Sequence, residues 1–185
     1  MSGRRSREAS GMTQHQRLEG DIRPGTYLID AARSSVRLTA THTFGLRPVD
    51  ATVAVRSGTV MVGTRPEQST VSADLDAASF TTDDPRRDKD VRGKRFLAVG
   101  THPAIGFRST GLSRTADGWQ LAGVLSVRGG SAPITLSIVD VEPVTDGYRI
   151  RATTTVDRVA AGVGAGRALI GRHVRVTVEC RVTSS

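Results

Sequence analysis

The chain has 185 residues, which favours a single domain, since about 100–200 residues per domain is usual and all-β barrels reach the upper part of that range. Its 26 lysines and arginines exceed its 18 aspartates and glutamates, for a formal net charge of +8. These basic residues are spread along the chain without a recognition helix, an RNA-binding aromatic signature or a zinc-finger spacing, so we expect no nucleic-acid partner. No window approaches the roughly 20 consecutive apolar residues of a membrane-spanning helix, so we expect no stable membrane insertion.

The first segment of the chain, residues 1–25, is polar and rich in glycine, serine and arginine. This composition predicts a mobile basic N-terminal arm, followed by one folded domain over residues 26–183. The arm contains no apolar run that could serve as the core of a signal peptide, so we expect a cytoplasmic protein.

Apolar and polar side chains alternate along most of the remaining chain. In residues 174–182, valine or cysteine occupies every even position, and arginine, threonine or glutamate every odd one. A period of two indicates an extended strand with one buried face. The same pattern predicts strands over residues 26–30, 35–43, 49–57, 59–63, 69–76, 105–110, 119–127, 133–141, 148–157 and 174–182. The pairs Asp117-Gly118 and Asp146-Gly147 are typical of tight hairpin turns.

One segment departs from this alternation. Residues 81–84 offer side-chain oxygens for a helix cap, and Pro85 suits a first helical turn. Residues 86–97 then carry spaced apolar positions among charges, which predicts the one helix of the chain. Gly93 weakens this helix and is expected to shorten or break it.

About eight to ten strands in successive hairpins, with one short helix, predict an all-β protein. We expect an antiparallel β-barrel of about eight strands, because closure removes exposed strand edges. A two-sheet sandwich would give much the same sequence, and periodicity does not separate the two. Aromatic residues make up only 4% of the chain, so the interior must consist of Val, Leu, Ile and Ala. An aliphatic wall with few rings leaves volume for a guest molecule.

Metal and thiol chemistry find little support in the sequence. The histidines, His15, His42, His102 and His173, show no short metal-ligand spacing, so we predict no metal site. Cys180 is the only cysteine, so no intramolecular disulfide can form. Its place on the apolar face of the last predicted strand indicates a small core residue.

Two glycine-containing motifs come close to catalytic or cofactor signatures. Residues 129–133 match a serine nucleophile elbow at Gly-x-Ser, but Pro133 stands where the last glycine belongs. Residues 162–166 resemble a dinucleotide loop, but Arg167 stands where its third glycine belongs, outside any βαβ unit. We therefore predict no catalytic residues and no cofactor, and we interpret residues 162–166 as a flexible connection between strands.

Two sets of polar residues remain as candidates for ligand contact. His42 follows the inward register of its strand and is either a hydrogen-bonded core histidine or a polar contact for a ligand headgroup. Residues 83–90 form the densest charge cluster of the chain. This cluster is either a solvated helix start, or it places Arg86, Arg87 and Asp88 at the mouth of a cavity. There a guanidinium would donate paired hydrogen bonds to a phosphate, carboxylate or phenolic headgroup.

An ordered set of short motifs covers most of the chain. It comprises residues 27–30 with Ser34 and Val36, then His42, Ser79-Phe80-Thr81-Thr82, Arg86-Arg87-Asp88 through Phe96, residues 102–109, residues 121–129 and Asp157-Arg158. Together they resemble the YceI-like family from about Tyr27 to Val182. The resemblance implies a lipocalin-like antiparallel barrel whose elongated apolar cavity holds a polyisoprenoid or similar long-chain amphiphile, often in a dimer. It also implies a bacterial, stress-related protein without catalytic activity.

The leading hypothesis is non-catalytic binding, carriage or sequestration of such a lipid. The predicted cavity wall consists of Val36, Leu38, Ala40, His42, Val53, Val55, Leu75, Phe80, Phe96, Phe107, Leu121, Leu125, Leu136, Ile138, Ile150, Val174, Val176 and Val178. One alternative is a small barrel enzyme, a hydrolase or isomerase that uses His42 or Asp88 on a hydrophobic substrate. Another is an interaction module with a filled core. A hollow interior would favour the carrier, and a filled interior would favour the interaction module.

Overall fold

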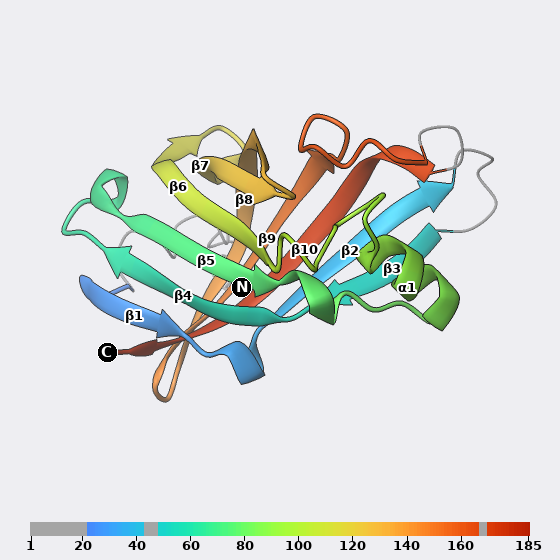
Figure 1. Cartoon of the computed structure of the whole chain (residues 1–185). Coiled ribbons are helices and arrows are strands. Elements are labelled where there is room, and N and C mark those ends of the chain that lie inside the picture. Colours follow the sequence, from blue (N-terminus) through green and yellow to red (C-terminus); the bar gives the residue numbers. More distant parts are fainter. Residues whose placement is uncertain (1–21, 43–47, 167–169) are drawn as a thin grey trace, which may run out of the picture.

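The computed structural model describes residues 22–42, 48–166 and 170–185, with side chains at all of these except residues 41, 42 and 170. These residues form a barrel with an α-helix at one end (Figure 1). Its strands are β1 (Gly25–Ile29), β2 (Ser35–His42), β3 (Pro48–Val53), β4 (Val55–Val62), β5 (Thr70–Asp76), β6 (Ala104–Thr115), β7 (Gly118–Val127), β8 (Gly130–Val144), β9 (Gly147–Asp157) and β10 (Ile170–Ser184). The helix is α1 (Pro85–Arg92), and short 3₁₀ turns lie at Ala31–Arg33, Pro66–Gln68 and Ala77–Ser79.

The first strand closes the barrel. Strands β4 to β10 pair in sequence order, and β1 pairs antiparallel with both β4 and β10. The result is an antiparallel ring of eight strands within the described residues. After the turn at Ala31–Arg33, β2 pairs along β10, and β3 pairs with β2. The predicted all-β, antiparallel barrel of about eight strands with one short helix is confirmed, and the two-sheet sandwich is excluded.

The strand predicted over residues 49–57 is divided at Ala54 between β3 and β4, and β4 continues through the break predicted at Gly58. Bulges account for two further departures from the predicted strands. Strand β6 reaches Thr115, beyond the predicted end at residue 110, because the pairing with β7 shifts between Ser109 and Gly111. A bulge adds one residue to one strand and so interrupts the period of two on which the prediction rested. The ladder between β8 and β9 shifts in the same way between Ile138 and Asp140, and this shift leaves Val139 exposed.

The helix begins as predicted and ends earlier. The Asp84 carboxylate accepts hydrogen bonds from the backbone amides of Arg86 and Arg87, and Pro85 occupies the first turn. The helix ends at Arg92, and Gly93 follows in extended conformation. Gly93 thus shortens the helix, as predicted, and residues 93–97 lie outside it. Leu97 instead belongs to the turn after the helix and packs with Phe80 and Val127 at this end of the barrel.

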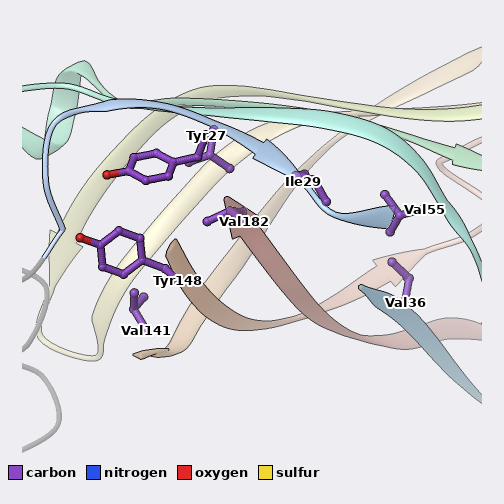
Figure 2. Close-up of a cluster of buried hydrophobic side chains, with 8 residues drawn as sticks. Tyr27, Ile29, Val36, Val55, Val141, Tyr148 and Val182 are labelled. Atoms are coloured by element: carbon purple, nitrogen blue, oxygen red, sulfur yellow. The ribbon is translucent and has the colours of Figure 1, made fainter. Parts of the chain in front are cut away.

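A pair of tyrosines fixes the start of the described chain to the barrel. The rings of Tyr27 and Tyr148 pack edge to face with centroids 5.5 Å apart, inside the cluster shown in Figure 2. The Tyr27 hydroxyl donates to the carbonyl of Arg23 at 2.7 Å, and the Arg23 amide donates to the Tyr148 hydroxyl at 3.0 Å. Ile22 packs against the same cluster. Residues 22–25 are thus attached to the barrel, although the sequence predicted them as part of the mobile arm.

Gly147 provides a sharp test of the barrel geometry. It opens β9 with φ of +155°, and a Cβ built there would lie 1.9 Å from the Val182 carbonyl oxygen of β10. We expect Gly147→Ala to lower the free energy of unfolding by about 2 kcal/mol or more, because the strand ladder must shift. Urea denaturation followed by circular dichroism measures this loss.

Gly111→Ala is the matched control for this substitution. A Cβ at Gly111 would meet no atom within 4 Å, so we expect a change of less than about 1 kcal/mol there. Equal losses in the two variants would contradict the close approach of β9 and β10.

Candidate functional site

The barrel encloses a large hollow with a volume of about 1030 Å³. This volume lies at the upper end of the range for ligand sites, about 300–1,000 Å³. The wall is aliphatic because the inward positions carry mainly Val, Leu, Ile and Ala rather than rings that would meet at the barrel axis. The described side chains leave the interior hollow, which contradicts the filled core that one alternative required.

The cavity extends along the length of the barrel. Arg87 and Val91 of α1 contribute to its wall, and so do Thr64 and Pro66 in the connection between β4 and β5. Figure 1 shows α1 and this connection at opposite ends of the barrel. The site is therefore elongated rather than round, a shape that accepts a chain-like molecule.

The predicted wall residues lie around the cavity. Those with described side chains all line the cavity, namely Val36, Leu38, Ala40, Val53, Val55, Leu75, Phe80, Phe96, Phe107, Leu121, Leu125, Leu136, Ile138, Ile150, Val174, Val176 and Val178. The backbone of His42 pairs with Ile170, but its side chain lies outside the described residues. Contact between these residues and a ligand stays a prediction.

Strand β10 shows most directly how the sequence builds this wall. Val174, Val176, Val178 and Cys180 line the cavity, and the residues between them point outward. Cys180, predicted as a small core residue, is therefore part of the cavity wall. Burial raises the pKa of its thiol, and a weaker opposing influence comes from a hydrogen bond with Ser34.

The charge cluster divides between the cavity and the loop before α1. Arg86 and Arg87 line the cavity, as predicted. Asp88 is not among the lining residues, in contrast to its predicted place at the mouth. Its buried carboxylate accepts hydrogen bonds from the Thr82 amide at 2.8 Å, the Thr82 hydroxyl at 2.7 Å and the Thr81 hydroxyl at 3.0 Å. Asp88 thus holds the loop against the first turn of the helix, because its side chain points back toward residues 81 and 82.

Two further arginines, Arg95 and Arg158, also line the cavity. The sequence did not predict either of them as a cavity residue. Arg158 follows β9 and is only 8% exposed. Its guanidinium donates to the carbonyls of Gly171 at 2.9 Å, Val163 at 2.8 Å and Ala165 at 2.7 Å. The glycine-containing segment 162–166 is thus a loop folded around an arginine. Arginine is seldom buried, so only the family motif Asp157-Arg158 could have drawn attention to it.

The glycine motif of residues 129–133 has a structural role. Arg128 and Gly129, with φ of +52° and +75°, form the tight turn between β7 and β8, and the elbow serine, Ser131, is exposed on β8. In residues 22–42, 48–166 and 170–185, no group of three or more His, Cys, Asp or Glu side chains could hold a metal ion. No helix in this part of the chain is long and apolar enough to cross a membrane.

Comparison with known proteins decides the family. Residues 27–182 match the YceI-like domain. The chain belongs to the YceI-like family. Among solved structures, this YceI-like barrel is similar to Burkholderia cenocepacia BcnA, with a TM-score of 0.69 and 21% identity over 84% of this chain and 99% of that one. It is also similar to a polyisoprenoid binding domain from Saccharophagus degradans implicated in plant cell wall breakdown, with a TM-score of 0.59 and 14% identity over 88% and 100% of the two chains. At these identities the likeness shows the shared fold.

Relatives at higher identity match only part of the YceI-like chain. A UPF0312 protein of Azotobacter vinelandii is 36% identical over 74 residues, which make up 40% of this chain and 38% of the relative. The UPF0312 protein YE1254 of Yersinia enterocolitica is 35% identical over 71 residues, or 38% and 37% of the two chains. The matched region therefore spans less than half the length of these relatives.

The hydrogen bonds to Asp88 predict a pH dependence of stability. The hydroxyl of Thr82 is the largest influence that holds the pKa of this carboxyl below its ordinary value of 3.8. A folded-state pKa below the unfolded one means that the carboxylate stabilises the fold above pH 3.8, and that this contribution is lost as the pH falls through the lowered value. We expect Asp88→Asn to unfold at lower urea concentration than the wild type at pH 7, and the gap to narrow below pH 4.

Asp83→Asn serves as the control for this measurement, since its carboxylate is exposed and meets only Arg87. Its urea midpoint should stay close to that of the wild type at every pH. A gap for Asp88→Asn that is independent of pH would show that the lost contact is not electrostatic.

Proposed function

We propose that this YceI-like barrel binds a polyisoprenoid or similar long-chain lipid in its cavity and carries or sequesters it without chemical change. The observation that carries the proposal is the elongated apolar cavity of about 1030 Å³. Burial of one CH₂ group contributes about 0.8 kcal/mol, so each five-carbon unit offers about 3–4 kcal/mol before ordering costs. A few enclosed units would therefore suffice for firm binding.

The chemistry of the wall supports binding rather than catalysis. Away from α1 the wall offers a ligand mostly methyl and methylene groups. Asp88, one of the two residues that the enzyme alternative offered as an acid or base, is turned toward Thr81 and Thr82 instead of the cavity. The fold shared with the polyisoprenoid binding domain of Saccharophagus degradans supports the same class of ligand.

Native mass spectrometry of protein purified from its natural host tests the proposal. We expect a mass increment that organic extraction removes, and that an added prenyl lipid restores. The same spectra report whether the protein is a homodimer, as the family resemblance predicts. Repeated recovery of empty protein that also fails to take up prenyl lipids would falsify the proposal.

Adjacent positions on β10 allow the cavity to be blocked in a controlled way. Val178 lines the cavity, and its neighbour Thr177 points outward and is exposed. We expect Val178→Phe to weaken prenyl-lipid binding about tenfold or more, because the added ring displaces roughly one isoprene unit. Thr177→Phe should bind as the wild type does. Fluorescence titration with a prenyl probe measures both, and equal affinities would contradict binding inside the barrel.

The single cysteine reports on occupancy of the cavity. Burial raises the pKa of Cys180, so little of the reactive thiolate forms at neutral pH. We expect slow reaction with a small apolar maleimide, and slower reaction still when a prenyl lipid is bound, because the lipid covers the thiol. Mass spectrometry follows the modified fraction over time. Unchanged rates at saturating lipid would place the ligand away from β10.

A further inference from the structure

The charged residues of the cavity wall lie in its α1 portion and the neighbouring β9–β10 loop. They are Asp84, Arg86, Arg87, Asp90, Arg95 and Arg158. Arginines outnumber aspartates, so this end carries a net positive formal charge. Toward the connection between β4 and β5, the wall carries the uncharged polar residues Thr64 and Ser69. The two ends of one apolar tube thus differ in charge.

Arg86 and Arg95 leave their charges available to a ligand. Arg87 is ion-paired with Asp83 at 3.0 Å and lies 3.9 Å from Asp84. Among the described residues, no such ion pair involves Arg86 or Arg95, although both are exposed and both line the cavity. An unpaired guanidinium beside an apolar cavity favours an anion there, because low-dielectric walls concentrate the field of the charge.

Arg158 adds a fixed positive group to the same end. Its carbonyl acceptors include that of Val163, and Val163 packs in the same apolar cluster as Leu97 and Val91 near α1. Three carbonyl acceptors hold its guanidinium in place, and it lines the cavity while it is 92% buried. This end of the cavity therefore has one buried arginine, fixed by carbonyl acceptors, beside the two exposed arginines Arg86 and Arg95.

We propose that Arg86 and Arg95 bind the phosphate group of a prenyl monophosphate or a related phosphorylated lipid, while its tail extends toward the connection between β4 and β5. This inference rests on the proposed function, and it adds the chemical class and the direction of the ligand. A phosphate monoester carries a charge of about −1.5 to −2 at neutral pH, which matches the excess of arginines. Guanidinium donates paired hydrogen bonds to phosphate, whereas a neutral alcohol or quinone would leave the charges of Arg86 and Arg95 uncompensated.

A titration of delipidated protein with a prenyl alcohol and with the monophosphate of the same alcohol tests the assignment. We expect the monophosphate to bind about tenfold tighter or more in low salt, with the advantage reduced as salt is added. In the double variant Arg86→Gln with Arg95→Gln, the advantage should fall to about twofold or less, while the affinity for the alcohol stays unchanged. Arg158 is left intact, because its loss would expose the loop that it holds.

The matched control is the double variant Arg37→Gln with Arg175→Gln, which removes the same charge from exposed positions outside the cavity. It should keep the preference for the monophosphate. The anion site is overturned if the control variant loses the preference as fully as the Arg86 and Arg95 variant does. It is also overturned if the wild type binds the alcohol and the monophosphate with equal affinity. Neither result contradicts the proposed lipid carrier. Inorganic phosphate that binds as tightly as the prenyl monophosphate also overturns the anion site. Failure of both lipids to bind overturns the proposed function itself.

Discussion

The hydrogen bonds of β1 to both β4 and β10 hold the barrel closed, and the hollow interior depends on them. In an open sheet, the apolar side chains of the inward faces would have to pack against one another to avoid contact with water. Closure satisfies the backbone of every strand in the ring, so the side chains need not fill the centre. Buried side chains instead form clusters around Tyr27 and Tyr148, around Phe80 and Leu97, and at Leu121 and Val156 along the wall. The inward side chains of the wall are mainly aliphatic.

The same architecture places two kinds of chemistry in one cavity. Strand positions supply the apolar wall, because every second residue must face inward. Connecting segments supply the charges, since α1, the turn after it and the loop after β9 are the parts of the chain in which alternation does not dictate polarity. A long apolar molecule with one polar end matches this division. The strands would determine the length and width of its tail, and the connections would determine the nature of its headgroup.

Period-two alternation predicted most of the strands and the part of the cavity wall that they carry, as Val174, Val176 and Val178 show most clearly. It failed at the bulges after Ser109 and Ile138, where one extra residue changes the register for reasons that depend on the neighbouring strand. The orientation of Asp88 and the burial of Arg158 depend on hydrogen bonds to Thr82 and to three distant carbonyls. Such contacts cannot be predicted from local composition. The positions of charged side chains near the cavity were therefore harder to predict than those of its apolar wall.

The hydrogen bonds between the tyrosine pair and residue 23 determine which substitutions the sequence tolerates there. Both hydroxyls bind main-chain atoms, so many amino acids at position 23 would preserve the attachment, and mutation there should be well tolerated. The tyrosines themselves cannot be replaced in this way, because phenylalanine would keep the ring but lose the hydrogen bond of the hydroxyl. Ile22 and Pro24, on either side, contribute to the cavity wall. Loss of either phenol would therefore also disturb the cavity wall at Ile22 and Pro24.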